Sequence, residues 1–120
     1  MNALDERGSL LAWQLRHYPG NHTDRINLAI HIGTVPLFWL GALALVLAPL
    51  WNGWLALPGI ALASLAVALQ GRGHRREPVA PIPFRGPFDI AAPICVEQLV
   101  TWPRFVLGGG LLKAWRAPRA

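Results

Sequence analysis

The chain has 120 residues, of which 53% are hydrophobic and only 14% are charged. Soluble domains carry about 25% charged residues, and the stretch from Leu28 to Gln70 contains no Asp, Glu, Lys or Arg at all. A soluble fold of this size could not bury so long an uncharged stretch, so the composition excludes an ordinary soluble domain and predicts an all-α integral membrane protein. The net charge of +5 does not indicate nucleic acid, because the basic residues gather beside an apolar run and in the tail, where anionic lipid headgroups would meet them.

The chain begins with a predicted amphipathic helix over residues 3–17, which the Pro and Gly of residues 18–21 end. Thr23 or Asp24 offers an N-cap for the next helix, which is expected from about Asp24 to Pro49. The lipid-compatible part of this segment, residues 32–50, is long enough to cross the hydrocarbon core of a bilayer.

A short turn at residues 50–53 leads to a second predicted span from Trp54 to about Gln70. The two spans form a helical hairpin whose turn carries no Lys or Arg, whereas three such residues precede the first span and eight follow the second. The positive-inside rule then predicts a multi-pass protein with both termini in the cytoplasm, as in a bacterial inner membrane.

After the second span, residues 77–87 are predicted to form an extended, proline-rich loop. Residues 88–106 are apolar but interrupted by charges, so we expect an amphipathic helix in the membrane interface, with a third span as the alternative. Gly108–Gly110 should end this helix. The chain is thus predicted to be one membrane-embedded domain over residues 1–110, followed by a mobile basic tail over residues 111–120. The oligomeric state is left open, with a homo-oligomer among the alternatives.

Histidines mark the expected cytoplasmic end of the hairpin. A hairpin brings the ends of its two spans together, so His22, His31 and His74 should meet at one membrane depth. Asp24, Glu77 and Glu97 are the carboxylates expected nearby. Imidazoles with carboxylates suit Fe, Zn or Mn, and His17 is the expected fourth ligand. The alternatives are a helix–helix hydrogen bond for His31 and a solvated ring for His17.

Arginines follow directly after the second span, at positions 72, 75 and 76. Arg72, Arg75 and Arg76 could bind a carboxylate or a phosphate, although topology and solvation are the favoured explanation. Glu97 and Arg104, seven residues apart, could form a structural ion pair on one helix face.

Three segments resemble the small membrane 2-hydroxy fatty acid dioxygenases. Residues 22–34 resemble that family's H-x-x-P-x-N-x-x-x-H signature, with Arg25 in place of its proline. Residues 70–78 resemble its Q-x-x-G-H stretch, although Glu77 follows His74 by three residues and longer members place it four away. Residues 97–106 are similar to the C-terminal block of short bacterial members.

The resemblance implies an Fe(II)-dependent enzyme. Such an enzyme would use O₂ to convert a 2-hydroxy fatty acid into the fatty acid one carbon shorter. It implies His22, His31 and His74 as iron ligands, with Asn27 and Glu77 orienting or completing the site. The rival expectation is a small non-enzymatic membrane protein that binds a metal, a lipid or a partner helix through its polar stripe.

Overall fold

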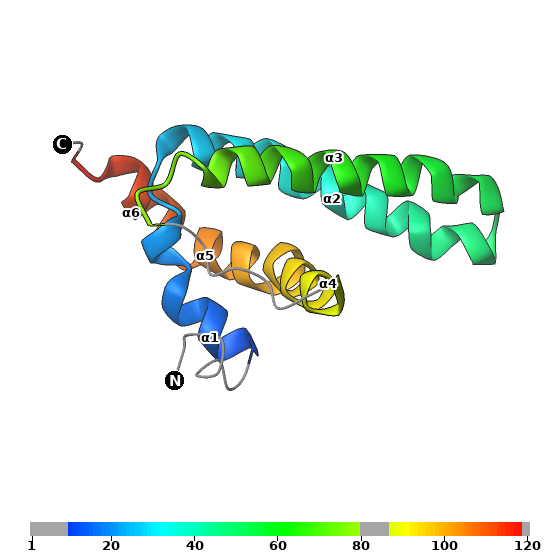
Figure 1. Cartoon of the computed structure of the whole chain (residues 1–120), viewed down its shortest axis with the longest axis horizontal. Helices are drawn as coiled ribbons and strands as arrows, with labels where there is room; N and C mark the ends of the chain where they lie inside the picture. The colour runs from blue at the N-terminus through cyan, green and yellow to red at the C-terminus, as the bar shows by residue number, and fades with distance from the viewer. Residues whose placement is uncertain (1–9, 80–86, 119–120) are drawn as a thin grey trace. The chain divides into compact units, whose positions relative to one another are not determined.

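The computed structural model describes residues 10–79 and 87–118, and within these ranges every regular element is helical (Figure 1). The all-α prediction is therefore confirmed for the described part of the chain. The elements, in chain order, are α1 (Leu10–His17), the 3-10 turn η1 (Pro19–Asn21), α2 (Arg25–Leu50), the 3-10 turn η2 (Gly53–Leu55), α3 (Ala56–His74), α4 (Pro87–Val96), the π-helical turn η3 (Glu97–Thr101), α5 (Trp102–Leu107) and α6 (Gly110–Arg116).

Three helical segments in the described residues are long and apolar enough to cross a membrane. They are Arg25–Leu50, Gly53–His74 and Ile90–Leu107. The chain is thus a membrane protein by the length and composition of its helices. The predicted count of two spans is not confirmed, because the segment expected to lie in the interface meets the same criterion as the other two.

The chain divides into two compact units, which we describe separately. Unit 1 comprises Met1–Arg25 and Glu77–Ala120, and unit 2 comprises Ile26–Arg76. Of the predicted elements in unit 1, residues 3–9 of the first helix and most of the 77–87 loop lie outside the described residues.

Unit 2 is a helical hairpin, in which α2 and α3 run side by side (Figure 1). Glycines allow the two backbones to approach closely: a Cβ added to Gly41 would lie 2.7 Å from the carbonyl oxygen of Gly59. Small residues at such a crossing are typical of membrane helix pairs, in which van der Waals packing replaces the hydrophobic effect. One polar contact also joins the helices, since Gln70 donates to the hydroxyl of Thr34 over 3.0 Å.

Unit 2 exposes apolar side chains where a soluble protein would place polar ones. Leu43, Val46 and Leu57 are each more than half exposed, and Trp51 and Trp54 beside the turn are 80% and 76% exposed. Lipid is the solvent that this surface suits, and the tryptophans stand where an interfacial belt would lie.

Unit 1 is built around the continuous run of α4, η3 and α5, against which α1 packs. The side chain of Gln14 donates to the carbonyl of Pro93 over 2.8 Å and accepts from the Thr101 hydroxyl over 2.7 Å. The π-helical turn is explained by Pro103, which lacks an N–H and would clash with a carbonyl one α-turn earlier. Widening the turn avoids that clash, and the N–H of Trp102 donates to the carbonyl of Glu97 instead.

The C-terminal part of unit 1 forms a helix within the residues that were expected to be a mobile tail. The helix does end at the predicted glycines, where Gly109 has a positive φ of 86°. The chain then continues as α6, and Arg25 donates from its Nε to the carbonyl of Trp115 over 2.8 Å. The residue that departs from the family signature thus binds the C-terminal helix.

Candidate metal site

The candidate metal ligands are four residues of the described chain, His22, His31, His74 and Glu97, which could hold a metal ion. Within unit 1, His22 and Glu97 form one pair of neighbours, and within unit 2, His31 and His74 form another. These residues could hold a metal ion, while metal binding itself and the identity of the metal stay predictions.

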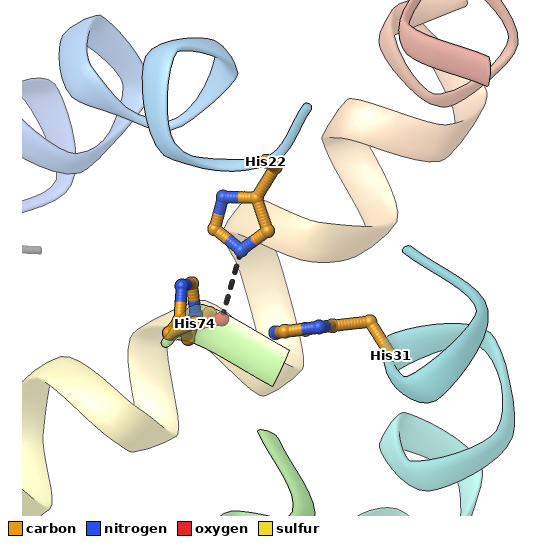
Figure 2. A group of neighbouring side chains, drawn as sticks. His22, His31 and His74 are labelled. Atoms are coloured by element: carbon orange, nitrogen blue, oxygen red, sulfur yellow. Dashed lines mark ion pairs between the residues drawn. The ribbon is translucent and has the colours of Figure 1, made fainter. Parts of the chain in front are cut away.

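His22 lies in an aromatic environment within unit 1. Its ring stacks on Tyr18 with 3.7 Å between centroids, and the rings of Trp102 and Phe105 lie 6.4 and 6.1 Å away. The residue is only 2% exposed. Its Nε2 lies 3.6 Å from Oε1 of Glu97, the contact drawn as a dashed line in Figure 2.

Glu97 is held by Tyr18 as well as by His22. The phenol of Tyr18 donates to Oε1 of Glu97 over 3.2 Å. Burial, and secondly the charge of Glu97, raise the pKa of Tyr18 well above its usual value, so the phenol stays neutral and remains a donor. The predicted Glu97–Arg104 pairing is replaced by these contacts with Tyr18 and His22.

His31 and His74 form the pair in unit 2. Their rings meet edge to face with 5.0 Å between centroids (Figure 2). His31 is fully buried on α2, and His74 is the last residue of α3, so the second helix runs four residues past its predicted end at Gln70.

The hydrogen bonds of His22 and His31 determine which ring nitrogen carries the proton. Nδ1 of His22 lies 2.9 Å from the carbonyl oxygen of Tyr18, and Nδ1 of His31 lies 2.9 Å from that of Asn27. A carbonyl oxygen can only accept, so Nδ1 is the donor in both rings, and in the neutral imidazole the lone pair then resides on Nε2. This is the arrangement that orients metal-binding histidines.

Glu77 and Asn27 were predicted to orient or complete the site, and these roles stay a prediction. The carboxylate of Glu77 accepts the N–H groups of Thr23 and Asp24 at 2.9 to 3.0 Å and the Thr23 hydroxyl at 2.7 Å. It therefore binds the N–H groups just before α2. Asn27 is fully buried, and its carbonyl holds His31.

The remaining predicted site residues lie elsewhere. His17 is exposed, with Nδ1 on the carbonyl of Trp13 at 2.8 Å, and it is not among the four candidate ligands. Arg72, Arg75 and Arg76 are exposed at the end of α3, and their role in binding substrate stays a prediction. The aromatic neighbours of His22 were not predicted, although Tyr18 lies four residues before His22, the spacing at which two side chains share a helix face.

Together, the apolar helices and the buried histidines define a small helical membrane protein with candidate metal ligands. No protein-family model matches the chain, and neither the curated proteins nor the solved structures contain a match.

Proposed function

We propose that His22, His31, His74 and Glu97 bind a single ferrous ion, and that the protein is an oxygenase acting on a 2-hydroxy fatty acid. The observation that carries the proposal is the matched pair of buried imidazoles, His22 and His31, each of which donates Nδ1–H to a main-chain carbonyl. Because Nδ1–H is held by a carbonyl in each ring, Nε2 is the nitrogen that can coordinate a metal ion.

The donor set suits iron. It combines imidazole nitrogens with a carboxylate, whereas the single cysteine, Cys95, is exposed and is not one of the four. Histidines with a carboxylate and open coordination positions are typical of non-haem ferrous oxygenases, although Zn and Mn accept the same atoms. When bound, the iron would supply the activation of O₂.

The surrounding side chains of unit 1 have roles that do not depend on the ion. The rings of Tyr18, Trp102 and Phe105 exclude water from His22, which strengthens every polar interaction there. The neutral phenol of Tyr18 orients Glu97 through its hydrogen bond. We further propose that an arginine after α3, one of the three at positions 72, 75 and 76, binds the substrate carboxylate.

The test is turnover by the purified protein in lipid nanodiscs, supplied with ferrous iron, O₂ and 2-hydroxy fatty acids of several chain lengths. We expect the substrate to be replaced by the fatty acid one carbon shorter. His31→Ala should abolish this turnover without unfolding unit 2, because Ala favours helix and costs little in lipid. His17→Ala is the matched control and should retain activity.

Two outcomes separate this proposal from its rival, a non-enzymatic membrane protein. If the folded, iron-loaded protein converts no 2-hydroxy fatty acid of any chain length, the oxygenase is excluded but the metal site is not. If His31→Ala instead retains wild-type iron content and loses only about 1 kcal/mol of helix association, His31 joins helices and is no ligand.

A further inference from the structure

Unit 1 contains an open cavity of about 260 Å³ that is separate from the four candidate ligands. Its lining consists of Leu15, Tyr18, Pro19, Thr101, Arg104, Phe105, Gly108 and Gly110. Small-molecule sites are concave, largely apolar and supplied with a few polar groups. This cavity matches that description, since its walls include aliphatic and aromatic side chains and one cation.

Arg104 provides the charge of the cavity. It is exposed on α5, and Glu97, its predicted partner, instead contacts Tyr18 and His22. The carboxylate of Glu77 is likewise engaged by the N–H groups of Thr23 and Asp24. An arginine beside an apolar wall suits a carboxylate or a phosphate, because its planar group can donate two parallel hydrogen bonds.

The size of the cavity limits what it can take. Ligand pockets measure roughly 300 to 1,000 Å³, so about 260 Å³ accommodates a headgroup with a few methylene groups and no complete acyl chain. Since Ile90–Leu107, which carries Arg104, is apolar enough to cross a membrane, the remaining chain would continue into lipid.

We propose that this cavity binds the anionic end of a single-chain amphiphile, with Arg104 as its counter-ion and Leu15, Tyr18 and Phe105 as its apolar walls. The chemistry required is a carboxylate or phosphate on an alkyl chain. This site does not depend on the metal or on turnover, so it can be tested independently of the proposed oxygenase. Tyr18 is the wall that the cavity shares with His22, so an occupied cavity would also press on the ring that stacks against His22.

The experiment uses the full chain in zwitterionic nanodiscs, treated with a chelator, and a fatty acid carrying a photoreactive diazirine next to its carboxyl group. Labelled residues are identified by mass spectrometry. We expect labelling within residues 101–110, competed by an unlabelled fatty acid or an alkyl phosphate but not by the fatty alcohol of equal length. The stronger competitor identifies the headgroup.

Variants then test the assigned residues. Arg104→Gln should lower the labelling about tenfold, the loss of roughly 1.4 kcal/mol expected for a charge-assisted hydrogen bond, and Arg104→Lys should restore part of it. Arg116→Gln on α6 is the matched control, since Arg116 is exposed but does not line the cavity. Leu15→Trp should block labelling by filling the cavity while helix content is unchanged. Equal competition by the alcohol, or wild-type labelling of Arg104→Gln, would overturn the proposal.

Discussion

Gly73 on α3 packs directly against Asn27 on α2, so closely that a Cβ at Gly73 would collide with Oδ1 of the asparagine. The carbonyl of Asn27 in turn accepts from Nδ1 of His31, and the ring of His31 meets that of His74, the neighbour of Gly73. One glycine therefore permits the helix approach that brings two candidate ligands together within unit 2.

Replacing this glycine should disrupt the unit. We expect Gly73→Ala to destabilise the hairpin by about 1–3 kcal/mol, the usual cost of overpacking, and to separate His31 from His74. Gly71→Ala is the matched control on the same helix, because a Cβ there meets nothing within 4 Å and the change should stabilise α3 by roughly 0.5–1 kcal/mol. Reversible unfolding in mixed micelles, followed by circular dichroism, measures both. Equal stability of the two variants would show that the close approach is dispensable.

Metal content provides the second prediction. Since second-shell changes already lower metal affinity about 10- to 100-fold, replacing a ligand should lower it further. We therefore expect His22→Ala, His74→Ala and Glu97→Gln each to lose more than about 100-fold in ferrous affinity. His17→Ala should bind as the wild type does, because His17 is exposed and lies outside the four candidate ligands.

Metal analysis after dialysis against buffered ferrous iron provides the measurement, and the wild type should hold one ion per chain. If Glu97→Gln retains iron and His17→Ala loses it, the fourth ligand is His17 and not Glu97.

Membrane topology follows from the number of segments that span. Two spans leave both termini in the cytoplasm, as the Lys and Arg distribution predicts, whereas a third span at Ile90–Leu107 would place the C-terminus on the opposite side. Reporter fusions after Asn52 and after the C-terminus distinguish these arrangements. We expect the Asn52 fusion to be periplasmic and the C-terminal fusion to be cytoplasmic. A periplasmic C-terminus would show that the third segment spans, and a cytoplasmic Asn52 would exclude the hairpin.

Alkaline titration of the metal-free protein tests the environment of Tyr18. Burial and Glu97 raise the pKa of Tyr18 in the folded state, so the folded chain holds its phenolic proton more tightly than the unfolded chain does. Stability is unaffected below pH of about 10, the usual tyrosine pKa, and falls as the pH rises from there toward the folded pKa.

Because the chain has a single tyrosine, the phenolate absorbance reports this group alone. We expect it to appear only above the pH at which a free tyrosine ionises, and at the ordinary pH once the chain is unfolded. Glu97→Gln should lower the pH at which Tyr18 ionises in the folded protein, because the negative charge of Glu97 is removed. An unshifted transition in the folded wild type would place Tyr18 in solvent.

Much of the architecture could be predicted from local features. Composition alone identified a membrane protein, because so long a stretch without charged residues must be surrounded by lipid. The helix breakers at residues 18–21 and 108–110 were also readable, because proline and glycine act on their own part of the backbone. His22, His31 and His74 were recognised as candidate ligands from their positions beside predicted helix ends, which is again a local property.

The structure alone decided which partners those residues have. Glu77 binds the N–H groups before α2, and Glu97 contacts Tyr18 and His22 rather than Arg104. Tyr18 and Glu97 are separated by 79 residues, and sequence spacing carries no information about contacts over such distances. The sequence thus determined where the helices form, through short-range sterics, and that lipid surrounds them, through the absence of charge. The pairing of donors, acceptors and ring faces depended on tertiary packing, because a side chain's partner is set by which helices meet and at what register.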